Sequence, residues 1–215
     1  MSRTVRVISI IRFTLALIIF TSCQKKQFNN LDDISQFLSD PTNGLTRQKS
    51  INGFDLNVKY IPAEFLALKD ISKSGTVQEY DSLILEYQKG IYFILNISPS
   101  EHKGRGDVML EGISSYPEYH ERFVNLSFHA SEMITLSCHS YIEPIQPILS
   151  TVIHSYGLTE NRQIMFAFEN SQDFNQCETV LIEFDDKEFG TGISNYSFSW
   201  NDIENFPSSR VNPKL

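Results

Sequence analysis

Five histidines are the side chains of this 215-residue chain that most directly suggest a metal site. His120 is followed by Glu121, as in the zinc-protease pattern, but the histidine that this pattern requires four residues after the first is missing. His129 and His139 are expected on neighbouring strands, yet a zinc site needs at least a third protein ligand, and the sequence does not identify one. We therefore interpret these histidines as structural or surface residues.

Asp185, Asp186 and Glu188 place three carboxylates in one predicted hairpin turn. Calcium takes six or more oxygen ligands, and this segment lacks the alternating acids and central glycine of a helix-loop-helix calcium site. Aspartate and asparagine are also ordinary turn residues. We interpret the segment as a solvated turn and predict no metal and no dissociable cofactor.

Nucleophilic catalysis has no recognisable motif in this sequence. There is no Gly-x-Ser-x-Gly elbow, and Cys138 falls inside a predicted strand rather than at the start of a helix. A phosphate-binding loop and a dinucleotide fingerprint are also absent. A Ser-His-Asp triad or a glycosidase carboxylate pair is assembled by the fold, so spacing cannot reveal either. We predict that the protein is not an enzyme and keep an envelope hydrolase as an alternative.

Cys23 is the residue whose context indicates a covalent modification. The first 12 residues contain three arginines and no acid, residues 13–20 are mostly apolar, and two small residues precede the cysteine. This order is typical of a cleaved secretory signal. A membrane-spanning helix needs about 20 apolar residues, and the uninterrupted run here is shorter. We therefore predict that residues 1–22 are a signal peptide.

The same segment resembles the lipobox of bacterial lipoproteins, in which small residues precede an invariant cysteine. The resemblance implies cleavage between Ser22 and Cys23, a diacylglyceryl thioether on the Cys23 thiol, and the new amino group as a further acylation site. Phe20 departs from the leucine that is more common there. Each buried methylene contributes about 0.8 kcal/mol, so two or three acyl chains anchor a protein firmly. The alternative is a plain signal peptide with an incidental Cys23.

The mature chain is strongly acidic. Of 18 basic and 26 acidic residues, the signal peptide contains three arginines and no acid, which leaves 15 basic residues and a formal net charge of −11. Because basic patches bind phosphate groups, this balance argues against a nucleic-acid partner. It also argues against adhesion to anionic lipid beyond the acyl anchor.

Residues 23–48 are polar and are interpreted as a tether that contains one short amphipathic piece, formed by Leu31, Ile34, Phe37 and Leu38. Residues 49–215 are predicted to form a single globular domain. Two cysteines remain in it, Cys138 and Cys177. Export makes a disulfide between them chemically feasible, whereas buried free cysteines are also common in strands. Both states stay open at this point.

Local patterns predict the elements of this domain. Residues 54–60 alternate as a half-buried strand after an Asn-Gly turn, and helices are expected over 63–71 and 77–88. Residues 91–97 are nearly all apolar, as in a central strand. Residues 99–120 are read as a loop, and further strands are expected over 123–128, 133–138, 145–155, 163–169, 180–184 and 193–200. Seven or eight short strands with two helices inserted near the N-terminus predict a mainly β, α+β domain with β-sandwich-like antiparallel sheets.

Several stretches resemble uncharacterised lipoproteins of Bacteroidota, namely residues 43–54, 60–68, 156–159, 190–193 and 203–207. The resemblance does not imply any particular activity. It implies a location in a Gram-negative cell envelope. The acidic run that often marks surface export in this phylum is absent after Cys23, where Gln24 and two lysines follow. This favours an anchor in the outer membrane that faces the periplasm.

Three functions fit these observations. The first, which we take as the prediction, is an accessory or structural lipoprotein that docks an unknown envelope protein through an apolar patch and has no deep pocket. The second is a carbohydrate- or small-ligand-binding lipoprotein, in which loop aromatics converge beside amides. The third is a hydrolase with a perturbed carboxylate or histidine in a cleft. Candidate aromatics in or beside loops are Tyr116, Tyr119, Phe123, Tyr141, Tyr156, Tyr196 and Trp200.

Overall fold

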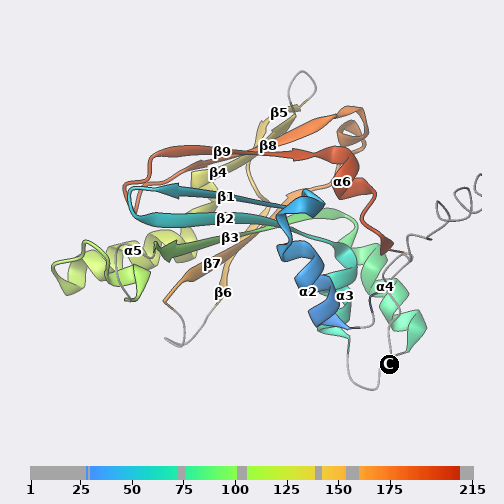
Figure 1. Ribbon diagram of the computed structural model, residues 1–215, viewed down its shortest axis with the longest axis horizontal. Helices are drawn as coiled ribbons and strands as arrows, with labels where there is room; N and C mark the ends of the chain where they lie inside the picture. The colour runs from blue at the N-terminus through green and yellow to red at the C-terminus, as the bar shows by residue number, and fades with distance from the viewer. Residues whose placement is uncertain are drawn as a thin grey trace, which may run out of the picture.

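The computed structural model describes residues 28, 30–71, 76–100, 106–138, 142–153 and 160–208, and the statements below concern those residues. Nine strands form two antiparallel sheets, a five-stranded sheet in the order β1-β2-β3-β7-β6 and a four-stranded sheet in the order β5-β4-β8-β9 (Figure 1). The strands are β1 (Thr46–Ile51), β2 (Phe54–Ile61), β3 (Gly90–Pro99), β4 (Ile134–Cys138), β5 (Ile142–Ile145), β6 (Leu149–Ile153), β7 (Arg162–Glu169), β8 (Thr179–Asp185) and β9 (Ile193–Ser199). The α-helices are α2 (Leu31–Ser39), α3 (Ala63–Asp70), α4 (Val77–Tyr87), α5 (Tyr116–Phe128) and α6 (Trp200–Glu204). This confirms the predicted mainly β, α+β fold with antiparallel sheets.

The two sheets share one hydrophobic core. Alternate residues of β2 and β3 are buried, and Phe93 at the centre of β3 is fully buried. The Phe93 ring lies 5.1 Å from the ring of Phe198 on β9, which belongs to the other sheet, and 6.3 Å from that of Phe168 on β7. Because side chains alternate along a strand, the residues between the buried ones point to the outer face of the five-stranded sheet. That outer face is where polar side chains can gather without disturbing the core.

Substituting Phe93 by alanine is expected to lower the free energy of unfolding by about 3–5 kcal/mol, because it removes a ring that bridges the two sheets and leaves a cavity. Phe128→Ala is the matched control, since Phe128 is 71% exposed on α5 and should change stability by about 0.5 kcal/mol or less. Urea unfolding of both variants measures the difference. Equal losses in the two variants would contradict the core described here.

The N-terminal elements follow from local signals. Asn52 and Gly53 both have positive φ, 50° and 81°, which the tight turn between β1 and β2 requires and which the Asn-Gly pair predicts. Helix α3 begins after Pro62, and α4 begins where the Thr76 side chain accepts a hydrogen bond from the Glu79 N–H. The two helices that were predicted near the N-terminus are therefore confirmed.

The interpretation of residues 23–48 as a tether is wrong for the part that the structure describes. Phe28, Ile34, Leu38 and Leu45 are at most 1% exposed and belong to the core, and β1 begins at Thr46. The short amphipathic piece noted in the sequence is helix α2, whose start is capped by Asn30, and a minority of apolar residues at helical spacing is enough to bury one face of it against the core. The folded domain therefore includes residues 30–48.

The strand predicted over residues 123–128 is also wrong, since these residues form the second half of α5. A short apolar run does not distinguish a strand from a helix, and the decisive signals lie upstream. Pro117 occupies the first turn of the helix, and the Glu118 carboxylate accepts hydrogen bonds from the Ser114 N–H and the Ser115 hydroxyl. The predicted loop over 99–120 accordingly contains the start of this helix.

Within the range predicted as one strand, residues 145–155, the structure has β6, and a strand that was not predicted, β5, ends at its first residue. β5 ends at Ile145 in the four-stranded sheet, and β6 begins at Leu149 in the five-stranded sheet. Pro147 lies between them, where its missing N–H interrupts any ladder of hydrogen bonds. The chain therefore crosses from one sheet to the other at this proline.

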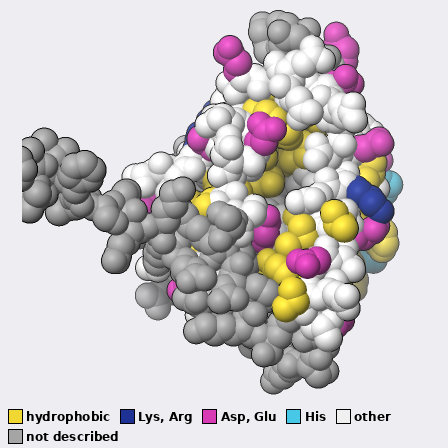
Figure 2. All heavy atoms as spheres, turned by 90° about the vertical axis from the view of Figure 1, so that its right-hand side faces the viewer, with side chains coloured by type: hydrophobic (Ala, Val, Ile, Leu, Met, Phe, Trp, Pro, Cys, Tyr) yellow, Lys and Arg dark blue, Asp and Glu magenta, His cyan; other side chains and the backbone are white. Residues whose placement is uncertain are grey.

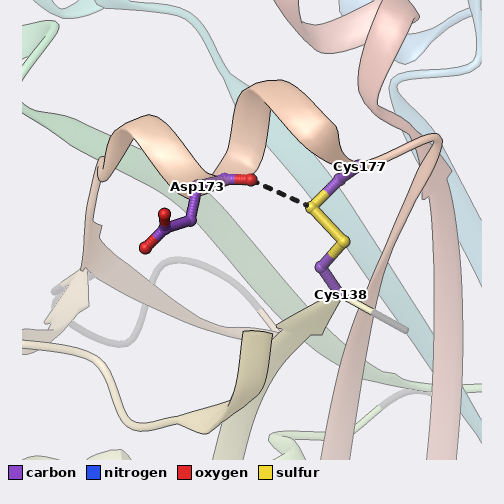
Figure 3. Close-up of a disulfide and its surroundings, with 3 residues drawn as sticks. All are labelled: Cys138, Asp173 and Cys177. Carbon is purple, nitrogen blue, oxygen red and sulfur yellow. Dashed lines mark hydrogen bonds between the residues drawn. A yellow bond between two sulfur atoms is a disulfide. The ribbon is translucent and has the colours of Figure 1, made fainter. Parts of the chain in front are cut away.

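Cys138 and Cys177 form a disulfide, one of the two states that the sequence left open (Figure 3). Cys138 ends β4, and Cys177 follows a short 3-10 helix over Gln172–Gln176. Their Cα atoms are 6.0 Å apart, and both residues are buried. The Asp173 carbonyl oxygen lies 3.8 Å from Cys177 Sγ, but a bridged sulfur carries no proton to donate. The bridge ties β4 to the segment that leads into β8.

Candidate functional site

A row of amide side chains crosses the outer face of the five-stranded sheet. The antiparallel register places Gln48 opposite Asn57, Asn57 opposite Asn96, and Asn96 opposite Gln163. Directly opposite residues on one face have Cβ atoms about 4.5–5.5 Å apart, so the four amides are neighbours on β1, β2, β3 and β7. Such a row presents hydrogen-bond donors and acceptors side by side on a rigid surface.

Three of these amides line a pocket of about 300 Å³, which we call the amide pocket. Helices α2 and α3 lie beside the end of β2 (Figure 1). Side chains from both helices line one wall of the pocket. Its lining consists of Ser35, Leu38, Asn57, Lys59, Ile61, Phe65, Ile94, Asn96, Asn161 and Gln163. A few polar groups placed among apolar ones are typical of small-molecule sites, and the volume lies at their lower end.

Lys59 gives the amide pocket its charge. Of the described residues that line the pocket, Lys59 alone is charged. Its Nζ donates a hydrogen bond to Ser39 Oγ at 2.7 Å, and burial lowers the pKa of the Lys59 ammonium. A cation that is partly removed from water and has a neutral partner favours the approach of an anion.

Contacts within the pocket hold the Asn96 side chain in place. Asn161 Nδ2 donates to Asn96 Oδ1 at 2.5 Å, and Asn96 also lies between Asn57 and Gln163 in the row. Leu38, Ile61 and Phe65 supply an apolar wall beside these polar groups. Chemically, the pocket can bind hydroxyl or amide groups through its amides, an anion through Lys59, and a ring through its apolar wall.

The residues predicted for lipid attachment, Ser22 and Cys23, lie outside the described residues, so the anchor stays a prediction. His139 also lies outside them. His129 is half exposed, and its Nδ1 is 3.0 Å from Glu132 Oε1. Within the described part of the chain, no group of three or more histidine, cysteine, aspartate or glutamate side chains could hold a metal ion.

The acidic turn between β8 and β9 is not simply solvated, which corrects the interpretation from sequence. Asp186 is 7% exposed, and its carboxylate accepts hydrogen bonds from the backbone N–H groups of Glu188, Phe189 and Thr191. Asp185 pairs with Lys187. The carboxylate of Asp186 therefore holds the turn in shape and is already occupied.

Arg122 is a buried cation that sequence reasoning missed. It is 8% exposed on α5, and its guanidinium donates to the carbonyl oxygens of Met109, Glu111 and Glu188 at 3.1, 2.8 and 2.7 Å. Its Cζ lies 4.8 Å from the centre of the Phe189 ring. These contacts tie α5 to the turn between β8 and β9, so the role of Arg122 is structural.

The aromatic residues singled out in the sequence do not converge beside the amides. Tyr116, Tyr119 and Phe123 lie together on α5, while Tyr196 and Trp200 are buried. Tyr141 and Tyr156 lie outside the described residues. The amides that do gather come from strands, and only the pairing register brings them together.

No protein-family model matches the chain, and no curated protein matches it. Among solved structures, the chain is similar to a novel protein of unknown function from Burkholderia pseudomallei, whose crystal structure was determined at 1.90 Å resolution. The two chains are 10% identical, the match covers 90% of this chain and 100% of that chain, and the TM-score is 0.38. A likeness at this level carries no argument about fold or function. None of the described helices is long and apolar enough to cross a membrane.

Proposed function

We propose that this protein is a bacterial envelope lipoprotein whose folded domain binds a small polar ligand in the amide pocket. Acylated Cys23 would hold it in the outer membrane on the periplasmic side, as in the lipoproteins of Bacteroidota that its sequence resembles. The Cys138–Cys177 bridge supports export, because cytosolic thiols are kept reduced. The ligand-binding role was the second alternative from sequence, and the row of amides beside Lys59 is the observation that now favours it.

The chemistry of the lining suggests the class of ligand. Amides on neighbouring strands can each donate and accept, which suits adjacent hydroxyl groups, and the Lys59 ammonium suits a carboxylate. Phe65 and its aliphatic neighbours suit the apolar face of a sugar ring. A monosaccharide that carries a carboxylate, such as a uronic acid, combines these features in a size that a pocket of about 300 Å³ accepts.

Lys59→Gln is expected to weaken binding of glucuronate or galacturonate to the purified protein by about tenfold or more, because it removes the one cation that faces the carboxylate. The neutral sugars glucose and galactose should bind weakly, and this substitution should change their affinity little. Isothermal titration calorimetry measures each affinity. Lys89→Gln is the matched control, since the Lys89 side chain is 71% exposed and pairs with Glu86 on the surface.

Two results would contradict the ligand-binding proposal. One is the absence of measurable heat with every acidic and neutral sugar tested. The other is uronic-acid affinity that is equal in Lys59→Gln and in the wild type, which would place the carboxylate elsewhere.

A second candidate function is the docking of an envelope protein partner. Phe128, at the end of α5, is 71% exposed, and Ile148 and Leu149, at the start of β6, are 71% and 51% exposed. Because α5 contacts β6, these apolar side chains lie on two packed elements. A stoichiometric partner that wild-type protein retains from native membranes and Phe128→Glu loses would favour this role.

A further inference from the structure

A second pocket, independent of the amide pocket, lies at one end of the sandwich. It has a volume of about 380 Å³ and is formed by the end of β2, the first turn of α3, the start of β3, and α6 with the residues that follow it. We call it the glutamate pocket, and its lining consists of Tyr60, Ala63, Glu64, Gln88, Gly90, Ile91, Asn170, Asn175, Trp200, Ile203, Glu204, Phe206 and Ser208. Figure 2 views the molecule from the side on which α6 and α2–α4 lie and shows hydrophobic side chains in a hollow, with acidic side chains close by.

Glu64 is the unusual residue of this pocket. It is 5% exposed in the first turn of α3, and the structure shows no hydrogen bond or ion pair from its carboxylate to any described residue. No lysine, arginine or histidine occurs among the described lining residues. A buried carboxylate without a cation is unfavourable, and a partner that supplies positive charge relieves that penalty.

The neighbouring tyrosines add no second negative charge beside Glu64. Burial raises the pKa of Tyr60 and of Tyr80 far above the ordinary value, and the Glu64 carboxylate raises both further. Both phenols therefore stay neutral at physiological pH. They surround Glu64 with aromatic and hydroxyl groups rather than with a counter-ion.

Two more polar groups in this corner lack partners. Among described residues, the Trp200 indole N–H and the Tyr80 hydroxyl are buried and form no hydrogen bond. Trp200 lines the pocket and stacks on Phe174 with ring centres 5.2 Å apart, which holds the indole in place. Buried polar groups in proteins are nearly always paired. The Tyr80 hydroxyl, which is near Glu64 but is not among the lining residues, can accept a hydrogen bond from an ammonium group. The Trp200 N–H can only donate, so it pairs with an acceptor elsewhere on a ligand.

We propose that the glutamate pocket binds a primary organic ammonium ion, with the ammonium group paired to Glu64. The side-chain oxygens of Gln88, Asn170 and Asn175 can accept the remaining N–H groups, while the aromatic rings of Tyr60, Trp200 and Phe206 contact the methylenes beside the nitrogen. Aromatic faces also attract cations directly. Glu204, exposed at the rim, adds negative potential that attracts a cation to the pocket.

Trp200 provides the test, because it is the only tryptophan of the chain and lines the pocket. Titration of the full-length protein with n-butylamine at constant ionic strength is expected to change its tryptophan emission saturably. Butyrate and n-butanol, which have the same carbon chain without the positive charge, should produce no saturable change. Isothermal titration calorimetry with n-butylamine gives a second measurement that does not depend on fluorescence.

Glu64→Gln is expected to weaken n-butylamine binding at least about 20-fold, as for loss of a charged partner from a buried pair. Glu86→Gln, whose side chain is 69% exposed on α4, is the matched control and should bind as the wild type does. Lys59→Gln in the amide pocket should also leave amine binding unchanged, so the outcome here is separate from that of the proposed function. If Glu64→Gln fails to fold by circular dichroism, Glu64→Asp keeps the charge and should retain saturable binding.

Three outcomes would overturn the proposal. They are no saturable response of the wild type in either measurement, n-butanol binding as tightly as n-butylamine, and a folded Glu64→Gln variant that binds the amine as well as the wild type.

Discussion

Replacing Cys23 by serine is expected to remove the protein from the outer-membrane fraction and to abolish its labelling with palmitate. A single acyl chain gives only reversible membrane binding, whereas two or three give stable anchoring, so loss of the acylated thiol changes membrane affinity by orders of magnitude. The rest of the chain offers little replacement, because without the predicted signal peptide of residues 1–22 it has a formal net charge of −11 and is repelled by anionic lipid. Separation of inner and outer membranes, together with mass spectrometry of the N-terminal peptide, measures both effects.

The matched control for the anchor is the double variant Cys138→Ser/Cys177→Ser. It removes the other two cysteines of the chain and should leave both the palmitate label and the outer-membrane location unchanged. Retention of the Cys23→Ser variant in the outer membrane, or a label that persists in it, would refute acylation at this residue. A label lost from the control instead would place the lipid on the folded domain.

Reduction of the Cys138–Cys177 bridge is expected to lower the free energy of unfolding by about 4 kcal/mol. The two cysteines are 39 residues apart, and closing a loop of that length removes roughly this amount of chain entropy from the unfolded state. The folded state changes little, because Cys138 is held opposite Val180 by the pairing of β4 with β8. For a domain of this size, the melting temperature should fall by about 8–16 °C.

Urea unfolding with and without a phosphine reductant measures the contribution of the bridge. Cys138→Ala/Cys177→Ala is the control, since it lacks the bridge and should unfold at the same urea concentration in either buffer. If reduction leaves the wild-type midpoint unchanged, the bridge does not stabilise the fold. If the control also shifts, the reductant acts on something other than the disulfide.

The two proposed pockets differ in the charge of their lining residues, although residues 59–65 contribute side chains to both. Lys59 and Phe65 line the amide pocket, whereas Tyr60 and Glu64 line the glutamate pocket. Successive residues of a strand point to opposite faces, so β2 delivers a lysine to one pocket and a tyrosine to the other. The sugar-acid and amine assays therefore test two chemically distinct sites with variants from a single stretch of chain.

Prediction from sequence succeeded where a pattern depends on neighbouring residues. The alternation in residues 54–60, the Asn52-Gly53 turn and the helix start after Pro62 are each determined by contacts within a few residues. It failed at residues 123–128, where a short apolar run fits a strand and a helix equally well. It also failed at residues 30–48, where the polar composition suggested a tether although Ile34, Leu38 and Leu45 are buried in the core.

Neither pocket could be predicted from the sequence. Asn57, Asn96 and Gln163 are far apart along the chain, and a register shift of one residue would turn any of them toward the core. Likewise, Glu64 follows Pro62 as an ordinary first-turn acid of a helix, and its burial depends on α6 and the residues after β7, which come more than 100 positions later. No periodicity in the sequence carries that information.

By itself, the sequence determined the short-range features of this protein: its acidic balance, the signal from which lipidation at Cys23 is predicted, the starts of α3 and α4, the Asn52-Gly53 turn and several alternating strands. The tertiary structure alone decided the row of amides, the burial of Glu64 and the Cys138–Cys177 bridge. The physical reason is that local patterns reflect interactions within one turn or hairpin. Sites are assembled instead by strand register and helix packing, which depend on the free energy of the whole core.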